Sequence, residues 1–462
     1  MRQVRARAVE SAAVRGDLST MASLTVTPAG PLRGTLTVPG DKSITHRAII
    51  LSALGDGSTG ISGYCRGEDC LNTMQAFRGL GVRVDETDHR LVVHGKGMWG
   101  LTEPEGPLDC GNSGTGIRLL AGALAGQDFF TVLTGDESIR KRPMGRVVKP
   151  LRQMGALIAG RKGGELAPLA VTGSKLRAID YQSRVASGQI KSALLLAALY
   201  AEGTTVISEP RASRDHTERL FEHFGIPLKR EGLAVMIEGR PSVRWGGGEI
   251  VVAGDLSAAA FFVVGATIVP ESRLTVTGVG INQTRAGVIN LLMKMGANIH
   301  IENHRHESGE PVADLSVQAA SLNGINIGAE DIPQTIDEFP ILCVAAAVAA
   351  GTTEISGAEE LRVKESDRIA TMASELRSMG ARIVEKPDGL LIQGLGGRHG
   401  NGRLSGTRCA SHGDHRVAMS LAVGALTATT PTTIEDTDCI ETSFPEFDRK
   451  LTNLLTGKAS SL

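Results

Sequence analysis

The sequence lacks any apolar run that approaches the ~18 residues needed to span a membrane. Its longest apolar stretches, such as residues 341–350, have the length of buried helices. An excess of charge is also missing, because 49 basic residues balance 50 acidic ones. A chain without a broad positive field is not expected to bind nucleic acid or a membrane surface. We therefore expect a soluble protein in which any cationic site is local.

Paired C-x-x-C motifs are absent as well. The six cysteines are Cys65, Cys70, Cys110, Cys343, Cys409 and Cys439. Because only the first two lie near each other, we expect reduced thiols in a cytoplasmic protein. His304 and His306 lack a third ligand, so no metal site is expected.

The first 22 residues lack the apolar core of a secretory signal and carry four arginines against two acidic residues. We expect a disordered leader or an upstream start, with an organellar transit sequence as the less favoured alternative.

Two segments look like known phosphate-binding or catalytic loops but do not match the sequence patterns of those loops. In VPGDKSITHRAII, Asp41 separates Gly40 from Lys42, so the loop of nucleotide triphosphatases does not fit. GNSGTG, which begins at Gly111, lacks both the G-x-G-x-x-G spacing of a dinucleotide site and the G-x-S-x-G elbow of a hydrolase.

What the chain does contain is a repeat. Small or acidic residues lead six times into a helix rich in Ala, Leu or Val, at steps of 70, 74, 70, 80 and 77 residues. The starts are Ser43, Ser113, Ser187, Ser257, Asp337 and Asp414. These helices are apolar nearly all round, which predicts that they are buried.

A second pattern keeps the same phase. An amphipathic helix ends at a hydrophobic residue and a glycine, and a strand, a turn and a strand follow. Glycine suits a helix C-cap, where a positive φ is needed. The glycines are Gly81, Gly155, Gly225, Gly296 and Gly380.

Each repeat therefore predicts a strand, a buried helix, a strand, a surface helix and two strands. Repeats of this size favour two globular α/β domains of three βαβαββ units each over a solenoid. We expect one domain at residues 42–254 and a discontinuous one at residues 23–41 and 255–462. The N-terminal strand, residues 24–38, would pack with the C-terminal half. A cleft between the domains is the natural place for a site.

Cations gather at helix starts and in loops, where free backbone N–H groups also favour an anion. They are Lys42, Arg47, Arg118, Arg142, Arg214, Arg362, Lys364, Arg368 and Arg416. Guanidinium groups bind carboxylate and phosphate as forks, so the expected ligand is small and heavily anionic. Two carboxylates accompany them: Asp337 as a helix cap or a base, and Glu365 as an ion-pair partner or a proton carrier.

These residues resemble those of the 5-enolpyruvylshikimate-3-phosphate synthase (3-phosphoshikimate 1-carboxyvinyltransferase) family, and in particular its class II branch. The motifs that carry the resemblance are PGDKSITHRA, GNSGTGIRLL, KRPMGR, SGQIKSALLLAAL, IDEFPIL, LRVKESDRI, GDHRVAMS and TSFPEF. The resemblance implies a two-domain inside-out α/β barrel. It also implies transfer of the enolpyruvyl group of phosphoenolpyruvate to the 5-hydroxyl of shikimate 3-phosphate, with release of phosphate, by a monomer without a cofactor.

The same resemblance implies the site. For shikimate 3-phosphate the matching residues are Lys42, Ser43, Arg47, Ser187, Gly188, Gln189, Arg214, Asp337 and Lys364. For phosphoenolpyruvate they are Lys42, Gly114, Arg142, Gln189, Arg368 and Arg416. Asp337 is expected to be the base at the 5-hydroxyl. Lys42 and Glu365 are expected to handle the proton on the enolpyruvyl side of a tetrahedral intermediate.

Three positions qualify the resemblance. Gly188 stands where some members have a second serine, which leaves only a backbone contact. Thr442 stands where many members have a lysine, which leaves one phosphate contact open. Gly114 implies room for glyphosate, an inhibitor that mimics phosphoenolpyruvate.

Two other functions stay open at this point. The sister enolpyruvyl transferase that acts on UDP-N-acetylglucosamine shares the fold and the donor. Its G-x-K-N start and its P-C-x-x-G-x-R loop match neither the DKS of this chain nor the surroundings of Cys110. A non-catalytic scaffold of six repeats would bind anionic metabolites without releasing phosphate.

Overall fold

The computed structural model describes residues 9–11, 22–28, 30–87, 89–397 and 400–457. The chain divides into two compact units. Unit 1 comprises Met1–Val38, Gly254–Arg305 and Val312–Leu462, and unit 2 comprises Pro39–Ala253 and His306–Pro311. The sequence predicts breaks after residues 41 and 254, whereas the structure has them after residues 38 and 253. No sequence pattern predicts that residues 306–311 join unit 2.

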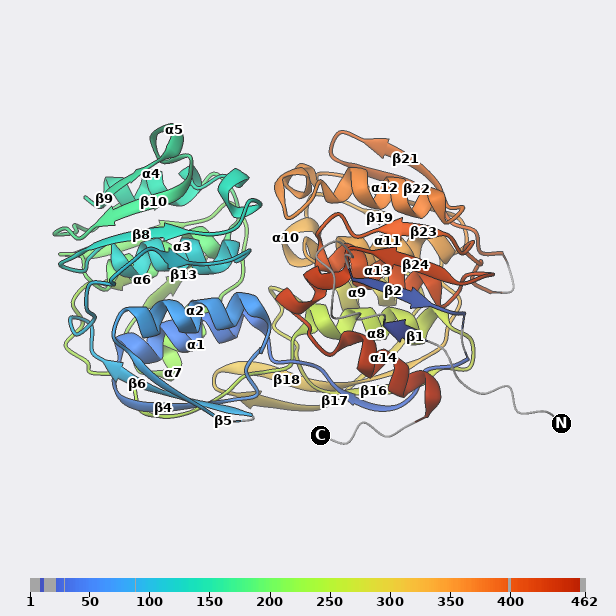
Figure 1. Ribbon diagram of the computed structural model, residues 1–462, viewed down its shortest axis with the longest axis horizontal. Helices are drawn as coiled ribbons and strands as arrows, with labels where there is room; N and C mark the ends of the chain where they lie inside the picture. The colour runs from blue at the N-terminus through green and yellow to red at the C-terminus, as the bar shows by residue number, and fades with distance from the viewer. Residues whose placement is uncertain (1–8, 12–21, 29, 88, 398–399, 458–462) are drawn as a thin grey trace. The chain divides into compact units, whose positions relative to one another are not determined.

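The described residues form six four-stranded sheets, three of them in unit 2 and three in unit 1 (Figure 1). The orders in unit 2 are β15-β4-β6-β5, β7-β8-β10-β9 and β11-β12-β14-β13. These strands are β4 (Asp56–Ser62), β5 (Arg83–Thr87), β6 (Arg90–Lys96), β7 (Leu108–Asp109), β8 (Phe130–Thr134), β9 (Leu157–Gly160), β10 (Leu166–Thr172), β11 (Asp180–Gln182), β12 (Thr204–Ser208), β13 (Lys229–Glu231), β14 (Ala234–Glu238) and β15 (Gly248–Val251).

The sheets of unit 1 have the orders β17-β18-β16-β3, β19-β20-β22-β21 and β1-β2-β24-β23. These strands are β1 (Val9–Ser11), β2 (Ser23–Val26), β3 (Arg33–Thr37), β16 (Arg273–Gly280), β17 (Asn298–Glu307), β18 (Glu310–Gln318), β19 (Asn326–Ile327), β20 (Thr352–Ile355), β21 (Arg382–Lys386), β22 (Gly389–Gln393), β23 (Arg408–Ala410) and β24 (Thr432–Glu435). Every one of these sheets contains a parallel pair of strands: β15–β4, β7–β8, β11–β12, β16–β3, β19–β20 and β23–β24.

The predicted core helices are α1 (Lys42–Leu54), α3 (Gly114–Leu124), α6 (Gly188–Ala198), α8 (Leu256–Ile268), α11 (Phe339–Val348) and α13 (His415–Ala425). Their burial is confirmed, since every residue of α8, α11 and α13 is buried. Side chains cap all of them except α11 by accepting a hydrogen bond from a first-turn N–H; the caps are Asp41, Ser113, Ser187, Asp255 and Asp414.

A second set of helices is amphipathic and comprises α2 (Glu68–Gly79), α4 (Gly145–Gln153), α7 (His216–His223), α9 (Gly287–Lys294), α12 (Arg368–Ser378) and α14 (Phe447–Thr456). The five predicted C-cap glycines follow the first five of these helices and have φ angles between 71° and 102°. The short helices are α5 (Arg161–Gly164), α10 (Ile332–Thr335), η1 (Ile139–Lys141), η2 (Glu359–Val363) and η3 (Thr437–Thr442). Among the described residues, no helix is long and apolar enough to cross a membrane.

Two strands exchange partners where the chain passes from one unit to the other. β3 precedes α1 and β4 in the chain, yet it pairs in parallel with β16. β15 precedes α8 and β16, yet it pairs in parallel with β4. The N-terminal strand therefore packs with the C-terminal half of the chain, as the sequence predicts.

The sixth repeat takes its last two strands from the N-terminus. β2 pairs antiparallel with β24, and β1 pairs antiparallel with β2. Within the predicted leader, Val9–Ser11 form β1, because β2 presents N–H and C=O groups to which an extended segment can bond. The other leader residues, 1–8 and 12–21, lie outside the described residues.

The C-cap glycines can be tested at Gly225, where φ is +71° and an added Cβ would meet no atom within 4 Å. Gly225→Ala should lower the free energy of unfolding by about 1 kcal/mol, because only the left-handed backbone is strained. Gly106→Ala is the matched control, since it adds a Cβ in equally open space without a positive φ. Equal urea midpoints for the two variants would contradict the role of Gly225 as a C-cap that needs a positive φ.

Candidate functional site

The start of α1 holds a paired lysine. Asp41 caps the helix by accepting a hydrogen bond from Ile44 N at 2.9 Å. Lys42 Nζ lies 2.7 Å from Asp69 Oδ2, with the two side chains 15% and 8% exposed. Asp69 belongs to the first turn of α2, where the helix dipole favours an acid. The ammonium group of Lys42 is thus fixed by a carboxylate but remains partly open to solvent.

Arg47 lies further along α1 and is buried. Its guanidinium donates to Ser43 O at 2.9 Å, to Thr217 Oγ1 at 2.8 Å and to Ser192 Oγ at 2.7 Å. Burial lowers the pKa of Arg47 to about 10, against the opposing attraction of the Glu218 carboxylate. Arg47 therefore remains a cation at neutral pH.

The start of α6 lies against the segment that carries Arg214. Ser187 caps the helix at Ile190 N, and its own backbone N–H donates to Glu209 Oε1 at 2.8 Å. A Cβ added at Gly188 would lie 3.1 Å from both the Cβ and the carbonyl oxygen of Arg214. A serine at this position would require that segment to shift, so the glycine has a steric reason.

Gln189 joins α6 to the start of α3. Its Oε1 accepts a hydrogen bond from Arg118 Nη1 at 2.8 Å, and its Nε2 donates to Thr115 Oγ1 at 3.0 Å. Gly114 is the first residue of α3, where an added Cβ would lie 2.9 Å from Arg118 Nη1 and 3.0 Å from Arg142 Nη1. The missing side chain lets both guanidinium groups approach the helix start.

These contacts unite the sequence-predicted residues of unit 2. Arg214 Nη1 lies 3.5 Å from Ser43 Oγ, and Arg47 Nη2 lies 3.4 Å from Gly188 O. Together with the contacts above they form one network. Its predicted members are Lys42, Ser43, Arg47, Gly114, Arg142, Ser187, Gly188, Gln189 and Arg214.

Unit 1 gathers its own group around Arg368, whose side chain is 1% exposed. Arg368 donates from Nε to Asp414 Oδ2 at 2.8 Å and from Nη2 to Glu365 Oε2 at 2.7 Å. Its Nη1 lies 3.5 Å from Asp337 Oδ1. Burial alone would lower the pKa of Arg368, but Asp414 and Glu365 outweigh it and raise the pKa. Burial would raise the pKa of Asp414, but the pairing with Arg368 lowers it.

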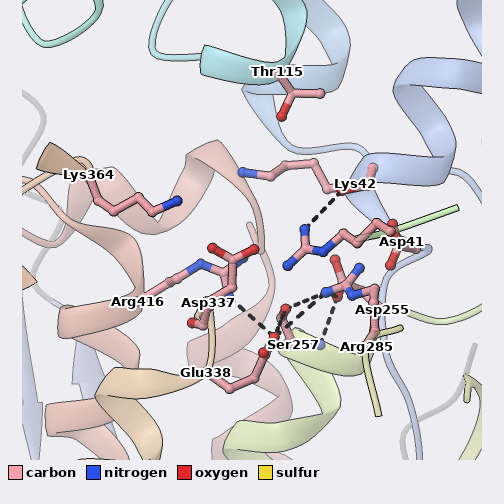
Figure 2. A network of polar contacts seen from close by, with 12 residues as sticks. Asp41, Lys42, Thr115, Asp255, Ser257, Arg285, Asp337, Glu338, Lys364 and Arg416 are labelled. Carbon is pink, nitrogen blue, oxygen red and sulfur yellow. Dashed lines mark hydrogen bonds and ion pairs between the residues drawn. The ribbon is translucent and has the colours of Figure 1, made fainter. Parts of the chain in front are cut away.

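Arg416 approaches Asp337 from the first turn of α13 (Figure 2). Its Nη1 donates to the backbone oxygen of Asp337 at 3.0 Å, and its Nη2 lies 3.7 Å from Oδ2. Lys364 Nζ lies 3.3 Å from Glu360 Oε1. Burial lowers the pKa of Lys364, and the attraction of Glu360 and Asp337 only partly offsets this. The predicted residues of unit 1 are thus brought together; they are Asp337, Lys364, Glu365, Arg368 and Arg416.

A buried polar layer lies next to Asp337 and Arg416 (Figure 2). Ser257 Oγ donates to Glu338 Oε1, and Arg285 Nη2 donates to Ser257 Oγ at 2.6 Å. Arg285 Nη2 also lies 3.3 Å from Asp255 Oδ1 and 3.7 Å from Glu338 Oε1. Since Glu338 follows Asp337 in the chain, this layer fixes the backbone that carries Asp337.

Sequence reasoning missed the internal partners of the cations. Asp69 and Asp414 lie at helix starts, a position that could have marked them, but their pairing with a cation could not be read from one sequence. Glu209 and Arg285 lie outside both repeat patterns and gave no signal. Thr442, the departure noted above, donates to a backbone carbonyl at 2.8 Å near the end of η3.

Comparison with known proteins decides the family. The family profile described as EPSP synthase (3-phosphoshikimate 1-carboxyvinyltransferase) matches residues 26–451. This chain belongs to the EPSP synthase family. Among curated relatives, 3-phosphoshikimate 1-carboxyvinyltransferase of Geobacter sulfurreducens is 53% identical over 427 residues, 92% of this chain and 98% of the relative. The enzyme of the same name from Pelobacter propionicus is 51% identical over 95% of this chain and 100% of its own length.

Solved structures agree with this EPSP synthase assignment. EPSP synthase from Acinetobacter baumannii matches with a TM-score of 0.83 at 43% identity, covering 94% of this chain and 98% of that chain. The predicted fold class, a two-domain inside-out α/β barrel, is thereby confirmed.

The buried pair of Arg368 and Asp414 predicts a pH-dependent loss of stability. Asp414→Asn leaves the guanidinium without its main counter-charge and should lower the free energy of unfolding by about 3 kcal/mol at neutral pH. Because the folded pKa of Asp414 is lowered, the native carboxylate stabilises the fold above the ordinary carboxyl pKa of about 4, and this contribution is lost as the pH falls through the folded pKa.

Urea unfolding followed by circular dichroism measures the free energy of unfolding of wild type and variant. The difference between the two should be constant from about pH 5 to 8 and should shrink below about pH 4. Glu435→Gln is the control, because it breaks an exposed ion pair with Arg408 in the same unit. The pairing of Arg368 with Asp414 would be contradicted if Asp414→Asn lowered the free energy of unfolding as little as the control does. It would also be contradicted if the difference from wild type grew toward acid pH.

Proposed function

We propose that this protein transfers the enolpyruvyl group of phosphoenolpyruvate to the 5-hydroxyl of shikimate 3-phosphate and releases phosphate. The observation that carries the proposal is the family match over residues 26–451, with relatives above 50% identity that bear the name of this activity. The fixed cations of both units support it, because both substrates are small polyanions.

Shikimate 3-phosphate binds at the starts of α1 and α6. The residues proposed to bind it are Lys42, Ser43, Arg47, Ser187, Gly188, Gln189, Arg214, Asp337 and Lys364. Guanidinium and ammonium groups suit its phosphate and carboxylate, while hydroxyl and amide groups suit its hydroxyls. The lowered pKa of Lys364 supports this assignment, since a buried ammonium gains a counter-charge when an anion binds.

Phosphoenolpyruvate binds the remaining cations. Its contacts are Lys42, Gly114, Arg142, Gln189, Arg368 and Arg416. The missing side chain at Gly114 lets the Arg118 and Arg142 guanidinium groups approach the start of α3, where they can receive the anionic donor. Together the two substrates carry about five negative charges, and fixed cations remove the repulsion that keeps them apart in water.

The reaction proceeds by addition and elimination. The 5-oxygen of the acceptor bonds to C2 of phosphoenolpyruvate while its proton passes to Asp337, and the methylene carbon takes a proton from Lys42 or Glu365. In the tetrahedral intermediate the C2–O bond to phosphate then breaks, and the methyl group returns its proton to the side chain that supplied it, which leaves the enolpyruvyl ether. The proton held by Asp337 leaves with the phosphate. Every step is a proton transfer, an addition or an elimination, which side chains can carry out without a cofactor.

We also propose that the enzyme is a cytoplasmic monomer. None of the six cysteines, which all lie within the described ranges, forms a disulfide, and five of them are buried. Free thiols suit a reducing compartment.

Phosphate release with each acceptor tests the function. Release with shikimate 3-phosphate and not with UDP-N-acetylglucosamine supports the proposal. Release with the nucleotide sugar alone assigns the sister activity, and binding of shikimate 3-phosphate without release assigns a non-catalytic scaffold.

Lys42→Met tests the proton-handling role of Lys42. Loss of a charge that touches both substrates should lower kcat by about 10³-fold, while circular dichroism shows an intact fold. Lys149→Met is the control, because it removes an exposed lysine of the same unit, paired with Glu165 at 2.5 Å. A normal kcat for Lys42→Met rules the role out.

Gly114 predicts competitive inhibition by glyphosate. Inhibition at varied phosphoenolpyruvate should raise the apparent KM of the donor without changing kcat. Gly114→Ala should weaken glyphosate roughly tenfold, because its Cβ displaces the Arg118 and Arg142 guanidinium groups at a cost of about 1 kcal/mol or more. Wild-type activity that is indifferent to millimolar glyphosate would contradict the prediction.

A further inference from the structure

Unit 2 buries a cluster of one lysine and two carboxylates behind the acceptor-binding residues. Lys191 Nζ lies 2.9 Å from Glu209 Oε2 and 2.8 Å from Glu218 Oε1. The side chains of Lys191, Glu209 and Glu218 are 6%, 3% and 1% exposed. Burial alone would lower the pKa of Lys191, but the attraction of Glu218 and Glu209 raises it.

Glu209 connects this cluster to both segments that bind the acceptor. Its Oε1 accepts a hydrogen bond from the backbone N–H of Ser187 at 2.8 Å. Its Oε2 accepts one from Ser213 Oγ at 2.7 Å. Ser187 precedes Gly188 and Gln189, and Ser213 precedes Arg214. One carboxylate therefore sets the spacing between the start of α6 and the segment of Arg214.

Lys191 reinforces the same spacing from α6. Besides its two ion pairs, its Nζ donates to the backbone oxygen of Ser213 at 3.4 Å. Glu218 extends the cluster to α7, next to Thr217, whose Oγ1 receives the Nε–H of Arg47 at 2.8 Å. Removing Lys191 would leave two buried carboxylates to repel each other directly behind these binding residues.

Stability alone does not explain such a cluster. A buried ion cluster is a poor stabiliser, because the cost of removing charges from water offsets most of their attraction, and apolar side chains of the same volume hold a core equally well. Besides Lys191, the Glu209 carboxylate contacts Ser187 and Ser213, which belong to the two acceptor-binding segments. The geometry is that of a support for those segments.

We propose that Lys191, acting through Glu209 and Glu218, is a positioning residue for shikimate 3-phosphate. The inference rests on the proposed function, since it assigns Lys191 to the acceptor half of that site. Lys191 touches no substrate; it fixes the distance between the Ser187–Gln189 backbone and Arg214 on which binding of the acceptor depends.

Calorimetric titration of shikimate 3-phosphate into wild type and Lys191→Met tests this positioning role. The Kd should rise by about tenfold, the worth of roughly one charged hydrogen bond. In turnover the KM of the acceptor should rise likewise, with kcat changed much less, because no reacting group is removed.

Tyr200→Phe is the matched control for destabilisation of the same helix. Tyr200 is buried just beyond the C-terminal end of α6, and its hydroxyl bonds to Gln127 and to Met98 O rather than to acceptor-binding residues. The Tyr200→Phe variant should bind shikimate 3-phosphate with the same Kd as wild type. An equal rise in Kd for both variants would show general loosening and overturn the inference.

Ser213→Ala keeps the inference testable if Lys191→Met does not fold, because it removes one hydroxyl and no charge. It should raise the acceptor Kd by a smaller factor than Lys191→Met does. An unchanged Kd in a folded Lys191→Met, or in Ser213→Ala where the first variant fails to fold, overturns the inference. If wild type itself does not bind shikimate 3-phosphate, the proposed function fails instead.

Discussion

Buried cations held by buried carboxylates of the same unit are the interaction on which this structure depends. Arg368 lies between Asp414 and Glu365, and Lys191 lies between two glutamates. Each pair is expensive to bury and strongly destabilising to break. In return, the charged groups keep fixed positions before any substrate arrives, so little side-chain ordering remains for the binding step.

The sixfold fold supplies the places where these pairs form. Its core helices are buried along most of their length, and many of the charged groups lie at or near their starts. Asp414 shows how one residue serves both needs, because it caps α13 at Arg416 N and pairs with Arg368. Asp255 does the same for α8 and Arg285. Helix capping and placement of the charged groups are thus one structural feature, and a change at such a residue affects stability and function together.

Much of the fold could be predicted because it is local. The apolar helices, their polar starts and the glycine C-caps each leave a signal within about a dozen residues. The candidate cations were found for the same reason. Their partners were not, since Glu209 lies 18 residues beyond Lys191 and Asp414 lies 46 residues beyond Arg368, and a pair formed by the fold leaves no local pattern. The strand β1 was missed because its partner is an edge created only by folding.

Nitrogen-15 NMR of the arginine side chains in the ligand-free protein measures this fixation of charge. If Asp414 holds Arg368 in advance, the Arg368 Nε–H gives a sharp signal protected from exchange with water, and saturating shikimate 3-phosphate and phosphate leave it nearly unchanged. A Nε–H that exchanges freely without ligand, and becomes protected only when the anions bind, would show that the ligands and not the internal carboxylates position the cation.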